Sequence, residues 1–489
     1  MTAGATMPRA SSAAPVLWTG AKIASATGGE GPTDWQAYGV AIDSREVEPG
    51  DLFIALPGAR HDGHAFAGQA RERGAVAVLA RHDAVLPAAN GPILRVKDTQ
   101  KALEALGAAA RARTGARIIG VTGSAGKTGT KDALHRCLSR LGPTHASVKS
   151  FNNAIGVPLT LARMMPGVDY GVFELGMNHA GELAALARQV RPQVAVITTV
   201  GAAHQEFFAS EEAIADAKAE IFAGLKAPGI AVINRDNRHY ARLAAAAGQA
   251  GVARVISFGL EPGADVVAER VALHEDMSCV AADIMGEKLI FKIGVPGRHW
   301  VMNALAVLAA VRALDGDLGL AGLALAEVRA LPGRGQRLPA RLGCGEILVI
   351  DDAYNANPAS MRAALEGLGQ TTPKGRGRRL AVLGDMKELG AASPAAHAAL
   401  AQPVRAAGVA HVIAVGPQMR HLAEALGGET AHLCLADAAA AREALKDLLR
   451  PGDVVLVKGS HSMGLADLVA WLAAGVHQPV RPGAREGRG

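Results

Sequence analysis

Short runs of β-branched and other apolar residues recur along this chain, each followed by a glycine- or aspartate-containing turn and then by a longer helical pattern. The runs occupy residues 117–121, 194–197, 347–350, 380–383, 411–415 and 454–457. Strands that are apolar along their whole length and alternate with helices are typical of parallel sheets covered on both faces. The pattern therefore predicts an α/β fold built on parallel sheets.

The spacing of these runs divides the 489 residues into three parts. One boundary is predicted near Arg113, just before the first strong strand, and another at Leu331-Pro332-Gly333, where a helical pattern gives way to new strands. The expected domains are residues 1–113, 114–330 and 331–489. Residues 476–489, which are rich in Pro, Gly and Arg, are predicted to be a disordered tail.

Composition narrows the class of protein. The chain is 49% hydrophobic but only 3% aromatic, so Ala, Val and Leu must fill its cores. A net charge of +6 is too diffuse to indicate nucleic-acid binding, and aromatic stacking platforms are lacking. The four cysteines form no Cys-x-x-Cys pair, which fits a reducing cytoplasm. With no signal-peptide pattern and no apolar stretch long enough for a bilayer, we expect a cytoplasmic protein without membrane insertion.

A glycine-rich segment follows the first strong strand. It reads Val121-Thr122-Gly123-Ser124-Ala125-Gly126-Lys127-Thr128-Gly129. Apolar residues at helical spacing follow it, at Leu134, Cys137, Leu138 and Leu141. Small residues before a helix let backbone N–H groups wrap phosphates, Lys127 can reach the terminal phosphates, and the Thr128 hydroxyl can bind Mg²⁺. We predict an ATP-binding loop at residues 122–129. Val121 stands where the strict pattern has glycine, and the loop alone would also suit a kinase or a GTPase.

Three further polar residues follow predicted strands in the middle third, namely Glu174, His204 and Asp236. Ligands of open parallel sheets bind beyond the carboxyl ends of strands. Glu174 and His204 are therefore candidate magnesium ligands beside Thr128, although the preference of Mg²⁺ for oxygen favours the glutamate. Each residue alone would be read as an ordinary surface group. Their shared position favours a site.

Lys218 falls on the apolar side of a predicted helix. Ile214, Ile221 and Leu225 stand at i, i+7 and i+11 of the apolar stripe, and Lys218 stands at i+4. An unpaired ammonium in such a place is costly, so the lysine should be paired, neutral, chemically modified or extended to water. The helical pattern leaves these alternatives open.

At these residues the sequence resembles the Mur ligase family. Shared features are the Thr-Gly-x-x-Gly-Lys-Thr loop with five residues between Gly120 and Gly126, the strand-end glutamate, Ala203-His204, and a lysine in an Ala-x-x-Lys-x-x-Ile helix. In the family that lysine is carbamylated, which would convert a buried ammonium into an anion. The resemblance covers nearly the whole chain apart from about the first dozen residues and the tail.

Other stretches resemble the family members that add D-alanyl-D-alanine. They lie at residues 43–45, 50–56, 62–66, 152–158, 351–358, 383–390 and 458–460. The resemblance implies a UDP-sugar-binding N-terminal domain, a central ATPase domain and a Rossmann-like C-terminal domain for the incoming dipeptide. The implied reaction is ATP-dependent ligation of D-alanyl-D-alanine to UDP-muramyl tripeptide through an acyl phosphate, by a monomer.

The resemblance also assigns site residues. Catalysis is expected from Lys127, Glu174, His204 and Lys218, with one Mg²⁺ on Thr128 and Glu174 and a second on His204 and carbamylated Lys218. The implied nucleotide contacts are Asn303, Arg334 and Asp351. The implied substrate contacts are Asp43, Ser44, Arg45, Asp62, His64, Asn152, Asn153, Asn355, Asn357 and Lys458.

Three positions depart from the family pattern: Gly129 replaces a common Thr, Trp300 a common Asn, and His461 a usual Arg. The nearest alternatives are another Mur-type ligase or a folylpolyglutamate synthetase. Residues 236–238 lack the proline of the Asp-Asn-Pro-Arg signature that marks the diaminopimelate- or lysine-adding member. A nucleotide-switch or transport ATPase is a more distant alternative, because it would not explain the Asp-Ser-Arg region or the placement of Lys218.

Overall fold

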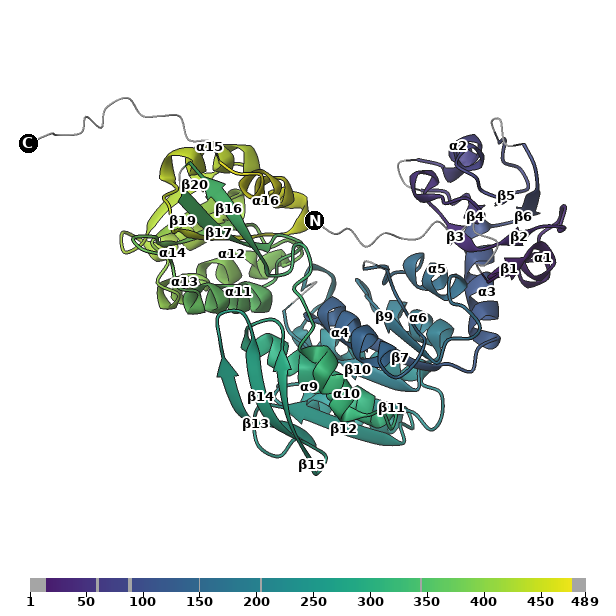
Figure 1. The fold of residues 1–489 in the computed structure, drawn as a ribbon, viewed down its shortest axis with the longest axis horizontal. Coiled ribbons are helices and arrows are strands. Elements are labelled where there is room, and N and C mark those ends of the chain that lie inside the picture. Colours follow the sequence, from purple (N-terminus) through teal and green to yellow (C-terminus); the bar gives the residue numbers. More distant parts are fainter. Residues whose placement is uncertain are drawn as a thin grey trace, which may run out of the picture.

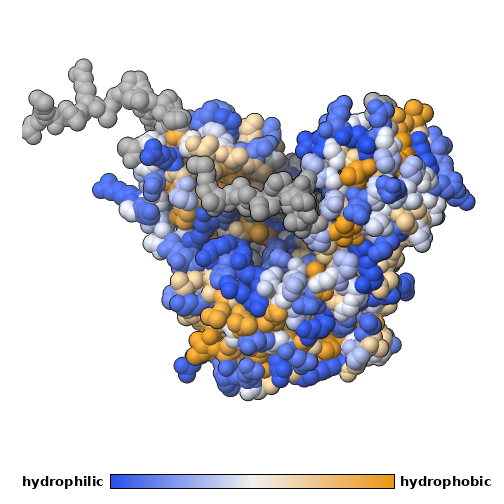
Figure 2. Space-filling view, turned by 45° about the vertical axis from the view of Figure 1, so that its right-hand side comes forward, coloured by the Kyte–Doolittle hydropathy of each residue, from blue (hydrophilic) through white to orange (hydrophobic). Residues whose placement is uncertain are grey.

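The computed structural model describes residues 15–58, 61–86, 90–148, 150–202, 205–343 and 345–476. Within these ranges the chain forms three α/β domains in sequence order, and both outer domains sit on the same side of the central one (Figure 1). In the space-filling view they rise as separate lobes with a hollow between them (Figure 2). None of the described helices is long and apolar enough to cross a membrane.

The N-terminal domain is built on a four-stranded parallel sheet in the order β3-β4-β5-β6. These four strands are β3 (Gly39–Ala41), β4 (Asp51–Ile54), β5 (Ala77–Arg81) and β6 (Ile93–Val96), while β1 (Trp18–Thr19) and β2 (Gln36–Ala37) form a separate antiparallel pair. Its helices are α1 (Gly20–Thr27), η1 (Ser44–Glu46), η2 (Gly63–Phe66), α2 (Ala67–Glu72) and α3 (Thr99–Ala112). Strand β4 is buried at every position, as expected for a strand covered on both faces.

Three side chains fasten this domain to helix α5 (Gly156–Ala162) of the central domain and to its C-terminal end. The Trp18 indole donates a hydrogen bond of 2.8 Å to the carbonyl of Ala162. The Arg113 guanidinium lies 3.6 Å from the centroid of the Trp18 ring and donates to the carbonyl of Met164 over 3.2 Å. The Arg163 guanidinium donates to the carbonyl of Val40 over 2.7 Å. The N-terminal domain is thereby held to the central domain by directional contacts as well as by packing.

The central domain contains a nine-stranded sheet in the order β15-β14-β13-β12-β11-β10-β7-β9-β8. Its strands are β7 (Arg117–Thr122), β8 (Thr144–Ala146), β9 (Tyr170–Glu174), β10 (Val194–Ile197), β11 (Ile230–Asn234), β12 (Arg254–Gly259), β13 (Val266–Leu273), β14 (Ser278–Ile284) and β15 (Glu287–Ile293). Neighbours from β8 to β13 are parallel, whereas β13, β14 and β15 form an antiparallel meander at one edge.

Helices cover both faces of this sheet. They are α4 (Lys127–Ser139), α5, α6 (Glu182–Val190), η3 (Gln205–Phe207), α7 (Glu211–Ala219), η4 (Glu220–Gly224), α8 (Tyr240–Gln249), α9 (Arg298–Ala313) and α10 (Leu318–Leu325). Successive residues of a strand point to opposite faces. Accordingly, Ile119 and Val121 pack in the core that holds α4, α9 and α10, while Ile118 packs in the core that holds α5 to α8.

The C-terminal domain contains a six-stranded sheet in the order β16-β17-β21-β18-β19-β20. Its strands are β16 (Gln336–Leu342), β17 (Gly345–Asp352), β18 (Arg379–Gly384), β19 (His411–Val415), β20 (Ala431–Leu435) and β21 (Val454–Lys458). Its helices are α11 (Pro358–Gln370), η5 (Gly390–Ala392), α12 (Ser393–Ala398), α13 (Ala401–Ala406), η6 (Pro417–Met419), α14 (Arg420–Leu426), α15 (Ala438–Leu448), η7 (His461–Met463) and α16 (Leu465–Ala473). All pairs are parallel except β16 with β17.

The predicted α/β class with parallel sheets is confirmed, with an antiparallel addition at β13–β15 and at β16. The boundaries predicted near residues 113 and 331 fall between the three sheets. The predicted tail is wrong at its first residue, because Val476 is buried and forms a parallel bridge with Leu342. Residues 477–489 lie outside the described ranges.

Candidate active site

The glycine-rich loop connects β7 to α4, where the sequence places it. Gly126 is the N-cap of α4 and has φ +82°, a conformation that glycine adopts without strain. A Cβ added at Gly123 would overlap the hydroxyl of Thr198, so the close approach of these two chains requires glycine. The Lys127 ammonium donates to the Gly123 carbonyl over 2.7 Å. The loop thus presents a helix N-terminus and one cation together, which suits a bound phosphate.

Thr128, in the first turn of α4, lies beside the buried carboxylate at the end of β9. Its hydroxyl donates to Oε2 of Glu174 over 2.8 Å, and Nδ2 of Asn152 donates to Oε1 over 2.8 Å. The glutamate is only 1% exposed. A hydroxyl and a carboxylate are the hard oxygen ligands that Mg²⁺ prefers. Among the described residues no group of three or more His, Cys, Asp or Glu is placed to hold a metal ion.

Lys218 lies in α7 with a side chain in the core, as the apolar stripe predicted. The residue is 2% exposed, between the fully buried Ile214 and Ile221. Burial, followed by the positive charge of Lys127, lowers the pKa of Lys218 well below its ordinary value, and no acidic group among the described residues offsets this. Of the alternatives left open by the sequence, extension to water is excluded by this burial. The geometry favours a neutral amine.

Two of the predicted strand-end residues, His204 and Asp236, are not seen at the glycine-rich loop. His204 lies outside the described residues, as does Ala203. Asp236 accepts the backbone N–H groups of Leu260 and Glu261 at 2.6 and 3.3 Å, which anchors the chain after β12. The Asp236 carboxylate therefore has a local structural role.

The C-terminal domain reaches the glycine-rich loop directly. Arg334 lies with its guanidinium 4.0 Å from the centroid of the Tyr354 ring and donates to the Ser150 hydroxyl over 3.3 Å. Asn357, the N-cap of α11, donates from Nδ2 to the carbonyl of Ser124 over 3.2 Å. Side chains separated by about two hundred residues in sequence therefore meet at the loop.

Other predicted residues support this junction from within. Asp351 accepts the N–H of Gly333 over 2.7 Å and so fixes the backbone beside Arg334. Lys458 is buried and forms an ion pair of 2.7 Å with Asp352. Asn153 caps the start of α5 by accepting the N–H of Gly156. These contacts shape the site without facing its interior.

A cleft of about 420 Å³ lies between the central and C-terminal domains. It is lined by Ser124, Lys127, Tyr354, Asn355, Ala356, Asn357, Lys387, Glu388, Leu389, Ser460, His461 and Ser462. His299, in the first turn of α9, is exposed to solvent, and desolvation by the surrounding protein atoms together with the positive charge of Lys458 lowers its pKa.

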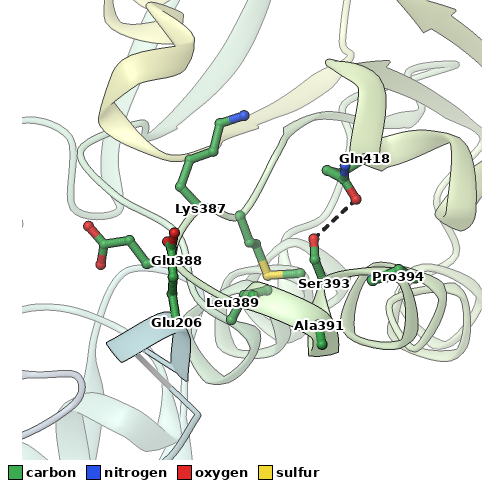
Figure 3. Close-up of a pocket in the computed structure, with 10 residues that line it drawn as sticks. Glu206, Lys387, Glu388, Leu389, Ala391, Ser393, Pro394 and Gln418 are labelled. Carbon is green, nitrogen blue, oxygen red and sulfur yellow. Dashed lines mark hydrogen bonds between the residues drawn. The ribbon is translucent and has the colours of Figure 1, made fainter. Parts of the chain in front are cut away.

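A second cavity of about 440 Å³ adjoins the first across residues 387–389 (Figure 3). Lys387 and Glu388 come from the loop after β18, whereas Glu206 comes from η3 of the central domain. The carbonyl of Glu388 accepts the N–H of Glu206 over 3.1 Å. Ser393 and Gln418 close another side through a hydrogen bond of 3.2 Å. This cavity therefore also lies at the seam between two domains.

Asp385 and His397, to which the sequence assigned no role, hold the loop after β18 in shape. Asp385 and His397 are fully buried, and Oδ1 of Asp385 accepts the N–H groups of Gln418 and Met419. Nε2 of His397 accepts the N–H of Met386 over 3.0 Å, while its Nδ1 donates to the Ser393 carbonyl. These hydrogen bonds fix the shape of the loop after β18, which lines the cleft.

The predicted substrate residues of the N-terminal domain make contacts within that domain. Arg45 donates to both carboxylate oxygens of Asp43, at 3.0 and 2.6 Å. Ser44 donates to the Gln69 side chain over 2.6 Å. His64 is buried, bonds to Asp62 over 2.5 Å and accepts the N–H of Arg81 over 3.0 Å. The hydrogen bond from His64 is the main cause that lowers the pKa of Asp62.

Sequence reasoning missed Thr198 and Ser150, which contact the loop and its surroundings. The Thr198 hydroxyl donates to the carbonyl of Ala125 over 2.6 Å. Thr198 directly follows β10, so the strand-end argument that found Glu174 could have found it. Ser150 lies in a loop without a pattern of its own.

Comparison with known proteins gives consistent matches in order along the chain. Three family models match: "Mur ligase family, catalytic domain" at residues 36–112, "Mur ligase middle domain" at 121–311 and "Mur ligase, glutamate ligase domain" at 333–461. The chain is 37% identical over 436 residues to UDP-N-acetylmuramoyl-tripeptide--D-alanyl-D-alanine ligase of Escherichia coli K12, with 88% of this chain and 92% of the relative covered.

Solved structures are similar over comparable lengths. A crystal structure of MurF from Acinetobacter baumannii has a TM-score of 0.81 and 32% identity, with 93% of this chain and 98% of that one covered. MurF ligase from Thermotoga maritima in complex with ADP has a TM-score of 0.73 and 28% identity, with 89% and 96% covered. Because relatives at this identity are covered almost end to end, the chain belongs to the Mur ligase family.

Proposed function

We propose that this protein uses ATP to join D-alanyl-D-alanine to UDP-N-acetylmuramoyl-tripeptide in peptidoglycan synthesis. The observation that carries the proposal is a single cleft lined by Lys127 of the phosphate loop and by Asn355 and His461 of the C-terminal domain. A nucleotide and an acceptor amine can therefore meet in one place. The similarity to ligases of this name, over nearly the whole chain, supports the choice of substrates.

The first half-reaction transfers the γ-phosphoryl group of ATP to the terminal carboxylate of the tripeptide. The bond from phosphorus to the ADP oxygen breaks and a bond to the carboxylate oxygen forms, which gives an acyl phosphate. Catalysis of this step requires in-line positioning and neutralisation of charge. Lys127 supplies a cation in the loop, and Arg334 is held beside the loop by its contact with Ser150.

In the second half-reaction the amine of the dipeptide attacks the acyl carbon. The carbon–nitrogen bond forms, the nitrogen loses a proton, and the bond to phosphate breaks. Water would hydrolyse the acyl phosphate, so closure of the site by two domains protects it. We place the dipeptide in the two adjoining cavities around Lys387 and Glu388, which lie on the C-terminal side of the cleft.

We further propose that Thr128 and Glu174 hold one Mg²⁺, and that Lys218 reacts with CO₂ to form a carbamate that holds a second together with His204. The buried hydroxyl–carboxylate pair fits the first ion, since both groups are hard oxygen ligands. The neutral amine of Lys218 is the form that combines with CO₂, releasing a proton. When bound, Mg²⁺ would neutralise charge on phosphate oxygens. Asn303, Arg334 and Asp351 are proposed to surround the nucleotide.

Phosphate release should require both UDP-muramyl tripeptide and D-alanyl-D-alanine, because the acyl phosphate forms on one substrate and is consumed by the other. A coupled phosphate assay with each component omitted in turn checks this. Free D-alanine should not replace the dipeptide. Turnover with a single free amino acid and none with the dipeptide would instead indicate another ligase of the family. Turnover with a folate and glutamate would indicate folylpolyglutamate synthesis, and phosphate release without either co-substrate a switch or transport ATPase.

A further inference from the structure

Two positions at which the chain departs from the family pattern lie against each other in the fold. Gly129 belongs to the first turn of α4, and Trp300 belongs to the first turn of α9. A Cβ added at Gly129 would lie 2.9 Å from Cη2 and 3.3 Å from Cζ3 of the indole. A Cβ atom does not normally come within 3.0 Å of another heavy atom. The indole therefore occupies space that a side chain at position 129 would need.

The contact is one of a pair between the same two helices. Asn303 follows Trp300 by three residues, so both side chains lie on one face of α9. A Cβ added at Gly126 would lie 2.6 Å from Oδ1 of Asn303. Helix α9 thus meets α4 closely at two glycines three residues apart, on either side of Lys127 and Thr128.

The indole of Trp300 has little room to move aside. Trp300 is 8% exposed and belongs to the core between the sheet and helices α4, α9 and α10. Thr128 and Thr130, which flank Gly129, are also buried. Protein interiors are packed too densely for a ring of this size to shift freely. A side chain added at Gly129 would instead push the first turn of α4, which carries Lys127 and Thr128.

We propose that Trp300 and Gly129 form one coupled unit that fixes the first turn of α4 and thereby sets the affinity for ATP. Trp300 is a positioning residue, since it acts through the backbone of the phosphate loop. The proposal rests on the proposed function only in requiring that this loop binds nucleotide. It predicts that the pair tolerates exchange of both residues together better than exchange of either one.

The test is a double-mutant cycle on the full-length protein, with Mg²⁺-ATP binding measured by calorimetry in the absence of the other substrates. Gly129→Thr should weaken ATP binding by about tenfold or more, because small displacements of positioning groups have large effects. Trp300→Asn should also weaken binding, since it leaves the first turn of α4 without its support. The double variant Gly129→Thr/Trp300→Asn should bind ATP more tightly than Gly129→Thr. Recording the melting temperature of each variant separates misplacement of the loop from loss of folding.

Gly248→Thr is the matched control, because Gly248 lies in helix α8 of the same domain with no atom within 4 Å of an added Cβ. It should leave the Kd for ATP unchanged. If Gly129→Thr does not fold, Gly129→Ala introduces the same Cβ contact with a smaller side chain. Effects of the two single changes that simply multiply in the double variant would overturn the proposal, as would Gly129→Thr with the wild-type Kd. Because binding is measured without turnover, a wild-type protein that binds ATP but fails to ligate would contradict the proposed function and leave this coupling intact.

Discussion

Replacing Lys218 with alanine should reduce ligase turnover by about two to three orders of magnitude, the usual loss when one electrostatic contact to a transition state is removed. Lys218→Arg should be equally damaged. If the lysine acts as a carbamate, both variants lack its anionic oxygens, and the arginine adds a buried cation beside Lys127. A small carboxylate such as acetate, at high concentration, should partly restore the alanine variant by supplying those oxygens.

The measurement is a phosphate-release assay with and without acetate, and Lys226→Ala is the matched control, because Lys226 is an exposed lysine shortly after η4. The control should retain wild-type turnover and show no response to acetate. Because burial lowers the pKa of Lys218, its amine is neutral at lower pH than the amine of an exposed lysine, which favours carbamate formation. Rescue by arginine without any effect of acetate would identify Lys218 as a plain cation.

Lys127→Ala should lose turnover to a similar extent, about two to three orders of magnitude, while the protein melts close to the wild-type temperature. The Lys127 ammonium donates its hydrogen bond to the Gly123 carbonyl within the same loop. Burial lowers its pKa, because the charged form is poorly solvated there, so removing this ammonium should cost the fold little stability. Turnover and thermal melting together check the prediction. The exposed Lys101, in α3, provides the control Lys101→Ala. A Lys127→Ala variant with near-normal turnover would show that the catalytic phosphate site lies elsewhere.

The strands that sequence analysis located are buried on both faces over most of their length. For β10 and β21 every residue is buried, so each appears as a continuous apolar run. The sequence pattern did not predict the meander β13–β15, because its strands are covered on one side only. In β14, buried and half-buried residues alternate, and such a strand carries charged and small residues among its apolar ones.

The site residues that the sequence predicted belong to local patterns, whereas those that it missed are brought together only by the fold. The phosphate loop and the buried Lys218 are local patterns, a strand–turn–helix and a helical stripe, and the structure places both as predicted. The contacts of Arg334 with Ser150 and of Asn357 with Ser124 join distant parts of the chain. No spacing in the sequence encodes such pairs, because they arise only when the sheets of two domains are set against each other.

The short helix α5 connects the proposed nucleotide site to a distant part of the molecule. Its C-terminal carbonyl, at Ala162, receives the Trp18 indole of the N-terminal domain, and Asn153 caps its other end. Next to that cap, Asn152 holds the Glu174 carboxylate. Seven helical residues span about 10 Å, and we expect a displacement of the N-terminal domain to be transmitted along this helix to Glu174. The alignment of that carboxylate would thus depend on contacts that the N-terminal domain makes at the far end of α5.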